Sequence, residues 1–78
     1  MPRFYLNPIF GGRPMRDHDG EDHPGLDDAR RSAIKGAREI LADQLRGGEV
    51  SFRGVEIADQ NGVVLKVVGI SEILRGPR

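Results

Sequence analysis

One stretch, from Leu26 to Arg46, has apolar residues at the spacing of an amphipathic helix, and the segments on both sides of it have the pattern of strands. The residues on one side of the helical wheel are alanine or aliphatic: Leu26, Ala29, Ala33, Ala37, Ile40 and Leu41, with Ile34 and Leu45 at the margin. The opposite side is polar and charged. A single apolar stripe is typical of a helix that covers other structure with one face. We therefore predict one helix lying across a sheet.

Charges and glycines mark both ends of this helix. Asp27 and Asp28 fall in the first turn, where carboxylates meet the positive end of the helix dipole, and Arg46 falls in the last turn. Gly47 or Gly48 can then adopt the left-handed conformation of a C-cap. The sequence therefore predicts both helix boundaries.

The segment before the helix predicts a hairpin. Residues 4–6 have strand character, and the following Asn7-Pro8 indicates a bend or an edge position, because proline cannot donate a ladder hydrogen bond. Gly11–Pro14 is typical of a turn. We expect a short second strand around Met15 and Arg16.

The segment after the helix predicts a second hairpin, with strands at residues 55–59 and 63–68. One helical turn is expected at residues 71–74, and residues 76–78 should fray. The predicted fold is a single α+β domain spanning residues 1–78, with a small antiparallel sheet (ββαββ) and one helix packed on one face.

Two loop lengths are open for the second hairpin at Gln60–Gly62. A two-residue Asn-Gly loop would set Ile57 opposite Lys66. A three-residue loop that ends in a left-handed glycine pairs Ile57 with Leu65 and Glu56 with Lys66, which separates an apolar face from a polar face. We predict the three-residue loop and this register.

Composition limits the partners and the compartment that we expect. The 78 residues suit one small domain, and 12 Lys and Arg balance 12 Asp and Glu. A neutral chain has no overall field to hold a polyanion, so we expect neither a nucleic-acid partner nor a membrane surface. No apolar run approaches the roughly 20 residues of a membrane helix, and the lack of cysteine fits a reducing compartment. We predict a cytoplasmic protein.

Residues along nearly the whole chain carry a family resemblance: Met1–Leu6, Asp17–Gly20, Pro24, Leu26, Ala29, Arg30, Ala33, Ala37–Ala42, Glu56, Asp59 and Gly62–Leu65. They resemble a family of small bacterial proteins of unknown function whose members open M-P-R-Y-F-F and carry D-x-x-G-x-E-L-P-D-L-x-x-A-R before one helix. Gly25 stands where that family usually has an aspartate, and Gly69-Ile70 where it usually has Pro-Phe. The resemblance implies a fold and a bacterial cytoplasmic setting, and no activity. More loosely, the loop and helix are similar to antitoxins of the HicB type, which neutralise a small RNA-cleaving toxin.

The loop predicted at residues 17–25 contains both histidines of the chain, His18 and His23, among four carboxylates. The spacing does not match a calcium EF-hand, because Gly20 comes at position four instead of six. Zinc could use the two histidines with a carboxylate, although a short exposed loop rarely supplies the supporting shell. We predict a solvated acidic turn without metal or cofactor, and a small metal-dependent enzyme is the third-ranked alternative.

Four basic residues of the predicted helix are candidate binding residues: Arg30, Arg31, Lys35 and Arg38. Arg30 falls within the apolar arc, where we expect its stem to lie along the core edge and its guanidinium to reach a carboxylate or backbone carbonyls. The other three could form a basic strip for phosphate, although nearby acidic residues can pair with them at helical spacing. A nucleic-acid-binding or antitoxin-like regulator would use this strip.

The predicted register leaves apolar residues on the sheet face away from the helix. If Val55, Ile57, Leu65 and Val67 point to the helix, the candidate interface consists of Tyr5, Ala58, Val64 and Val68. An exposed apolar patch of this kind usually has a partner. No nucleophile has a base near it in sequence, so we predict no catalytic residues. The leading hypothesis is a non-enzymatic cytoplasmic interaction module that forms a homodimer or binds an unknown protein partner.

Overall fold

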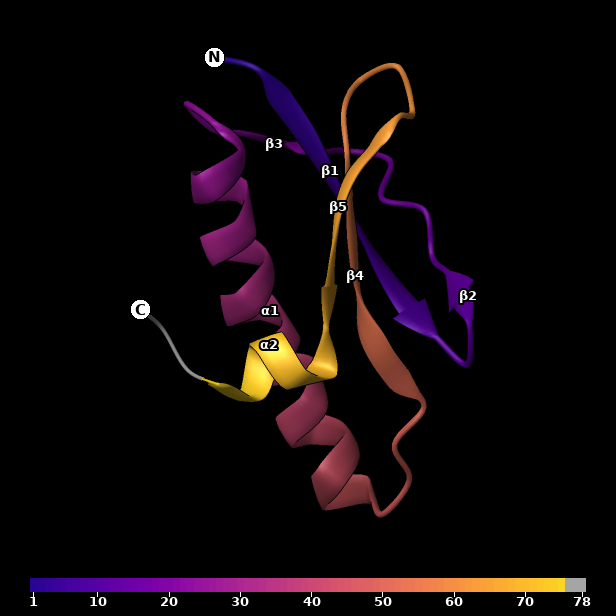
Figure 1. Ribbon diagram of the computed structural model, residues 1–78. Helices are drawn as coiled ribbons and strands as arrows, with labels where there is room; N and C mark the ends of the chain where they lie inside the picture. Colours follow the sequence, from indigo (N-terminus) through magenta and orange to yellow (C-terminus); the bar gives the residue numbers. More distant parts are fainter. Residues whose placement is uncertain (76–78) are drawn as a thin grey trace.

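The structure of the protein is a computed structural model, and it describes residues 1–75 (Figure 1). Its elements in chain order are β1 (Arg3–Phe10), β2 (Arg13–Pro14), β3 (Glu21–Asp22), α1 (Leu26–Gly47), β4 (Phe52–Ala58), β5 (Val64–Gly69) and α2 (Ile70–Arg75). The strands form one antiparallel sheet in the order β2-β1-β4-β5, and β3 pairs with the start of β1. The predicted α+β class is confirmed, whereas the predicted fraying of residues 76–78 lies outside the described residues.

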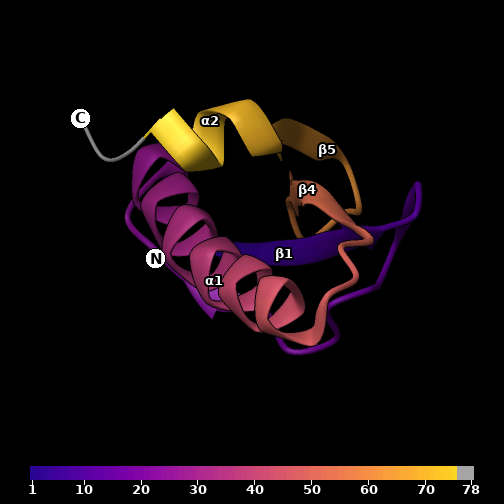
Figure 2. The same ribbon diagram turned by 90° about the horizontal axis from the view of Figure 1, so that it is seen from below.

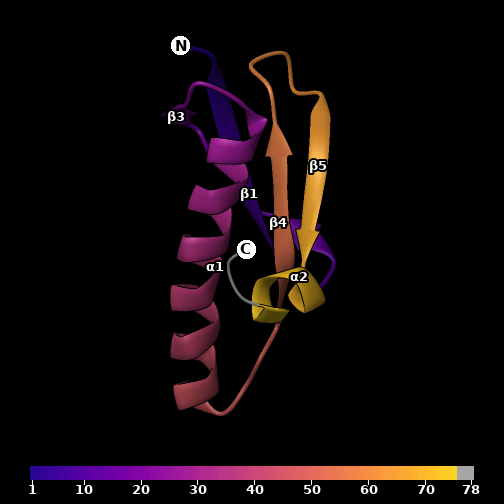
Figure 3. The same cartoon turned by 60° about the vertical axis from the view of Figure 1, so that its left-hand side comes forward.

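The two helices lie on one side of the sheet. α1 runs across that face, and Figure 3 shows the sheet and this helix as two layers. α2 follows β5 directly and packs against α1, so the two helices together form the helical layer of the fold (Figure 2). The core between the layers consists of Phe4, Ala29, Ala33, Ile34, Ala37, Leu41, Phe52, Val55, Ile57, Val68 and Ile73. The other face of the sheet is covered by neither α1 nor α2.

The N-terminal strands differ from the prediction. β1 does not stop at Leu6 but continues to Phe10. Pro8 is tolerated because its carbonyl accepts a hydrogen bond from Met15 N–H on the side away from β4 (2.7 Å). The N–H and C=O of a strand residue point to the same edge, so the donor that proline lacks is not needed by the ladder with β4.

The strands that pair with the outer edge of β1 were also misplaced. β2 occupies Arg13–Pro14 instead of the predicted position at Met15 and Arg16, and Glu21–Asp22 forms β3 where we expected only loop. Both are two-residue strands, too short to show a periodic pattern. They form because β1 is long enough to pair with both along one edge.

The loop of the second hairpin was predicted correctly, and its register was not. Asp59 N–H donates to Val63 O (2.9 Å), and Gly62 has a φ of 82°, as a three-residue loop with a left-handed glycine requires. Ala58 then pairs with Val64, but Ile57 pairs with Lys66 because Leu65 is an extra residue in a bulge. Because the bulge adds one residue, every later side chain of β5 points to the face of the sheet opposite to the predicted one.

This bulge decides which valines are buried. Val68, predicted to face away from the helix, is 0% exposed and belongs to the core. Leu65 and Val67, predicted to face the helix, are 43% and 53% exposed. Lys66 lies on the helix side, and its ammonium is 3.7 Å from the Glu72 carboxylate.

The connection from α1 to β4 is fixed by Gln44. Its side-chain Oε1 accepts the N–H groups of Ser51 (2.8 Å) and Phe52 (2.9 Å). Gly48 adopts the predicted left-handed C-cap, with φ 87° and its N–H bonded to Leu45 O. The helix end and the first residue of the central strand β4 are therefore held together by one amide side chain.

Candidate interaction surface

The face of the sheet away from α1 presents side chains in rows, each with one residue from β1, β4 and β5. The rows are Tyr5, Ala58 and Val64; Asn7, Glu56 and Val67; and Ile9, Gly54 and Gly69. A polar pair, Asn7 and Glu56, thus lies between two apolar rows. We call this surface the outer face.

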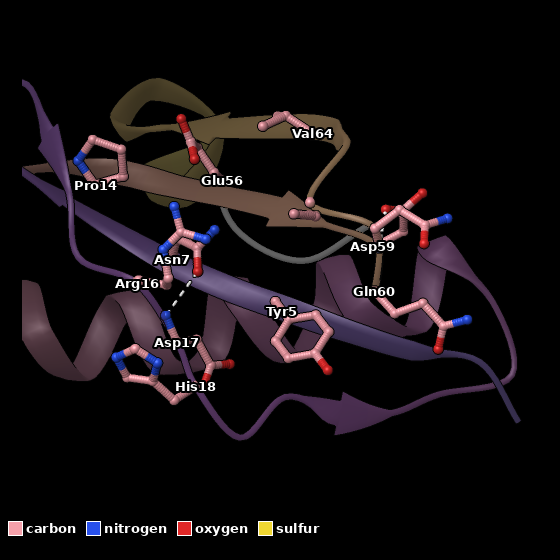
Figure 4. Close-up of a pocket in the computed structure, with 13 residues that line it drawn as sticks. Tyr5, Asn7, Pro14, Arg16, Asp17, His18, Glu56, Asp59, Gln60 and Val64 are labelled. Carbon is pink, nitrogen blue, oxygen red and sulfur yellow. Dashed lines mark hydrogen bonds between the residues drawn. The ribbon is translucent and has the colours of Figure 1, made fainter.

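A groove of about 580 Å³ lies over part of the outer face. Its floor contains Tyr5, Asn7 and Glu56, and one wall is the loop with Arg16 and His18. The opposite wall is the hairpin loop at residues 59–62 (Figure 4). The size suits several side chains of a partner or a small ligand.

The wall with Arg16 is held in place by Asp17. Its carboxylate accepts the backbone N–H groups of Leu6 (3.1 Å), Asp19 (3.1 Å) and Gly20 (3.2 Å). In return, Asp17 N–H donates to the side-chain oxygen of Asn7 (2.9 Å), the dashed contact in Figure 4. Side chains thus replace ladder hydrogen bonds along the part of β1 between β2 and β3.

These contacts change the acidity of Asp17. Burial raises the pKa of the carboxyl, whereas the hydrogen bonds from Gly20, Leu6 and Asp19 and the charge of His18 lower it. The net result is a pKa below the usual range for aspartate. The charged carboxylate therefore stabilises the loop at neutral pH.

We expect Asp17→Asn to lower the free energy of unfolding by about 1 to 2 kcal/mol at pH 7, because it removes a charged acceptor of three N–H groups. A folded-state pKa below the unfolded value gives stability that is present above about pH 4 and is lost as the pH falls through the folded pKa. The difference in the free energy of unfolding between wild type and variant, measured by urea unfolding, should therefore become smaller below pH 4. Asp19→Asn is the matched control, and a gap independent of pH would contradict the assignment.

Comparison of the chain with known protein families finds a match. The model of a domain of unknown function, DUF6894, matches residues 3–71. The chain belongs to this family. No curated protein and no solved structure matches the chain. The match includes all three rows of the outer face, and it confirms the resemblance to a family of unknown function, whereas the bacterial setting stays a prediction.

The predicted interface of the DUF6894 chain is only partly exposed. Tyr5 is half-buried and Val64 is 46% exposed, and both line the groove. Ala58 lies on the outer face but is only 4% exposed, and Val68 is on the opposite face in the core. Including Val68 was wrong, because the bulge at Leu65 reverses its direction.

The predicted basic strip is largely engaged in contacts within the chain. Arg31 pairs with Asp28, and the Arg38 guanidinium donates two hydrogen bonds to Ile73 O (3.1 and 3.2 Å). Lys35 is exposed. Arg38 thereby fastens α2 to α1, and the binding of nucleic acid by this strip stays a prediction.

Arg30 reaches a carboxylate, as its place in the apolar arc predicts. It pairs with Glu72 on α2, which also lies near Lys66 on β5. The hydrogen bond from Arg30 lowers the pKa of Glu72 against the opposing effect of burial, and the charges of Arg30, Lys66 and Arg75 lower it further. Arg30, Glu72 and Lys66 thus link α1, α2 and β5, and Arg30 has a structural role.

The two histidines lie in different surroundings. Glu21 accepts a hydrogen bond from Ser32 Oγ (2.7 Å) and lies 2.8 Å from His23 Nε2, while His18 borders the groove. The His23 ring packs against Phe4, with 6.3 Å between ring centroids. Among residues 1–75, no three His, Asp or Glu side chains gather as a metal site would require.

No helix in this part of the chain is long and apolar enough to cross a membrane.

The sequence did not single out Arg16 or the floor residue Asn7. Arg16 was assigned to a strand, and Glu56 was expected opposite Lys66, where the two charges would compensate each other. The structure instead pairs Glu56 with Val67 and Asn7. Within residues 1–75, neither Arg16 nor Glu56 has an ion-pair partner or a side-chain hydrogen bond, although both line the groove. The bulge removes Lys66 from the side of Glu56, and the contacts of Asp17 with β1 bring Arg16 to the groove; neither could be identified from the sequence.

Proposed function

We propose that the DUF6894 chain is a non-enzymatic interaction module that binds a second copy of itself through the outer face. The observation that carries this proposal is a run of exposed apolar side chains on and beside β5: Val63 (55%), Val64 (46%), Leu65 (43%) and Val67 (53%). Val64 and Val67 lie on the outer face, and exposed apolar surface of this kind typically marks an interaction site. Its removal from water would supply the driving force for association.

The outer face supports this proposal better than the free edge of β5. A sheet edge is protected against pairing by bulges and by inward-pointing charges. β5 has both devices, because Leu65 forms a bulge and Lys66 turns inward toward Glu72. We therefore place the second copy over the outer face instead of along the edge.

A second copy also fits the shape and charge of this surface. The groove lies beside the apolar side chains of β5, so a two-fold rotation would lay β5 of each copy over the groove of the other. The chain has equal numbers of acidic and basic residues, so two copies do not repel each other at long range. A stable interface needs about 600 to 800 Å² from each partner, a modest share of the 5196 Å² surface of one chain.

Sedimentation equilibrium at rising concentration tests this proposal. We expect the wild type to reach the dimer mass at high micromolar concentration, and Val64→Lys, Val67→Glu to remain monomeric, because the two substitutions place charges in the proposed interface. Leu45→Lys, Leu74→Glu is the matched control, since these residues are 63% and 66% exposed on the helices. A monomeric wild type, or a dimer disrupted only by the control substitutions, would contradict the proposal.

A further inference from the structure

We infer that the two copies are aligned by a reciprocal ion pair, in which Arg16 of each copy binds Glu56 of the other. This inference rests on the proposed function, because it names the contacts by which the outer face would recognise a second copy. It also goes beyond an apolar contact, since it fixes the relative orientation of the two sheets.

The position of Glu56 requires a cation once the outer face is covered. Glu56 is half-buried on the central strand β4, with Asn7 and Val67 as its cross-strand neighbours. Within residues 1–75 it has no ion-pair partner, whereas Glu72 has two. A carboxylate that loses its water without gaining a partner is strongly unfavourable. Once a partner covers this face, Glu56 therefore needs a positive charge beside it.

Arg16 is the cation that the same surface offers. It lies on the loop beside β1 and is exposed, and it lines the groove together with Glu56 (Figure 4). The next residue, Asp17, holds the backbone of this loop through three N–H groups, so the base of the Arg16 side chain has a fixed position. A guanidinium is well suited to a carboxylate because it can donate two parallel hydrogen bonds.

Two-fold symmetry lets both residues be paired at once. In an isologous interface, if residue i of one copy contacts residue j of the other, then j contacts i as well. One operator therefore gives two Arg16–Glu56 pairs across the interface. A small cationic ligand in the groove would pair with Glu56 and leave Arg16 unpaired, so a second copy accounts for more of the surface.

Charge reversal tests the pairing, with sedimentation equilibrium as the measurement. We expect Arg16→Glu and Glu56→Arg each to weaken dimerisation by about tenfold or more, because each variant brings like charges together twice. The double variant Arg16→Glu, Glu56→Arg restores opposite charges and should recover most of the wild-type dimer. Arg13→Glu is the matched control, since it changes the same charge at an exposed position on β2.

The wild-type mass and the variants decide different questions. A wild-type dimer that is unchanged by both single reversals would overturn the ion pair and leave the proposed function standing. Weakening by both single reversals without recovery in the double variant would also overturn it. A monomeric wild type would overturn the pairing together with the proposed function. Circular dichroism melting of each variant separates these outcomes from loss of the fold.

Discussion

Gly54→Ala is expected to lower the free energy of unfolding by about 3 kcal/mol, because the sheet leaves no room for a side chain at this position. A Cβ atom on Gly54 would overlap the backbone oxygen of Val68 and lie 3.3 Å from Gly69 Cα. The φ of Gly54 is 157°, which an alanine rarely adopts. Relief would require β4 and β5 to separate, and their pairing buries Val68.

The matched control for this prediction is Gly36→Ala in α1. No atom outside the local helix lies within 4 Å of a Cβ built on Gly36. Alanine is preferred over glycine in a helix by about 1 kcal/mol, so this substitution should stabilise the protein. Urea unfolding at one fixed protein concentration measures both variants. Equal midpoints for the two variants would contradict the packing described at Gly54.

Phe52→Ala is expected to cost about 3 to 5 kcal/mol, because it would empty a fully buried site at the start of the central strand. Phe52 is 0% exposed, and its ring packs on Phe10 with 5.7 Å between centroids. Its N–H is bonded to Gln44, so the backbone is held in place and cannot easily close the cavity.

The same unfolding measurement decides this second prediction. Leu45→Ala serves as the control, because Leu45 is 63% exposed and its truncation should change stability by less than about 0.5 kcal/mol. If Phe52→Ala and Leu45→Ala have similar midpoints, the core is not centred between α1 and β4.

The helix could be predicted from the sequence because its signal is long and local. The apolar stripe continues over many turns, and five of its residues are buried as expected: Ala29, Ala33, Ile34, Ala37 and Leu41. Leu45, at the margin of the stripe, is 63% exposed. The pairing of Arg30 with a carboxylate was expected, but not its identity, since Glu72 comes close only when α2 packs against α1.

The second hairpin shows what local patterning cannot determine. The side chains of β5 are apolar except that of Lys66, so both registers place apolar side chains on both faces of the sheet. Alternation alone could therefore not reveal the bulge at Leu65. The ion pair with Glu72 and the burial of Val68 favour the observed register, and both depend on the position of α2. The candidate interface therefore contained one residue, Val68, from the wrong face.

The groove was also beyond prediction, because it depends on contacts between distant residues. Asp17 binds Leu6 N–H and donates to Asn7, which places the loop with Arg16 beside β1. The sequence shows Asp17 only as one carboxylate in an acidic segment. The role of Asp17 depends on the extension of β1 past Pro8. The sequence indicated a bend or an edge position there, because proline cannot donate a ladder hydrogen bond.

The most direct test of a two-fold contact through the outer face is the mass of an equimolar mixture of Arg16→Glu and Glu56→Arg chains. Each variant alone should sediment closer to the 8.6 kDa mass of one chain than the wild type does at the same concentration. In the mixture, both interface contacts again join opposite charges, so we predict sedimentation at twice that mass. A mixture that remains monomeric at these concentrations would contradict the reciprocal contact.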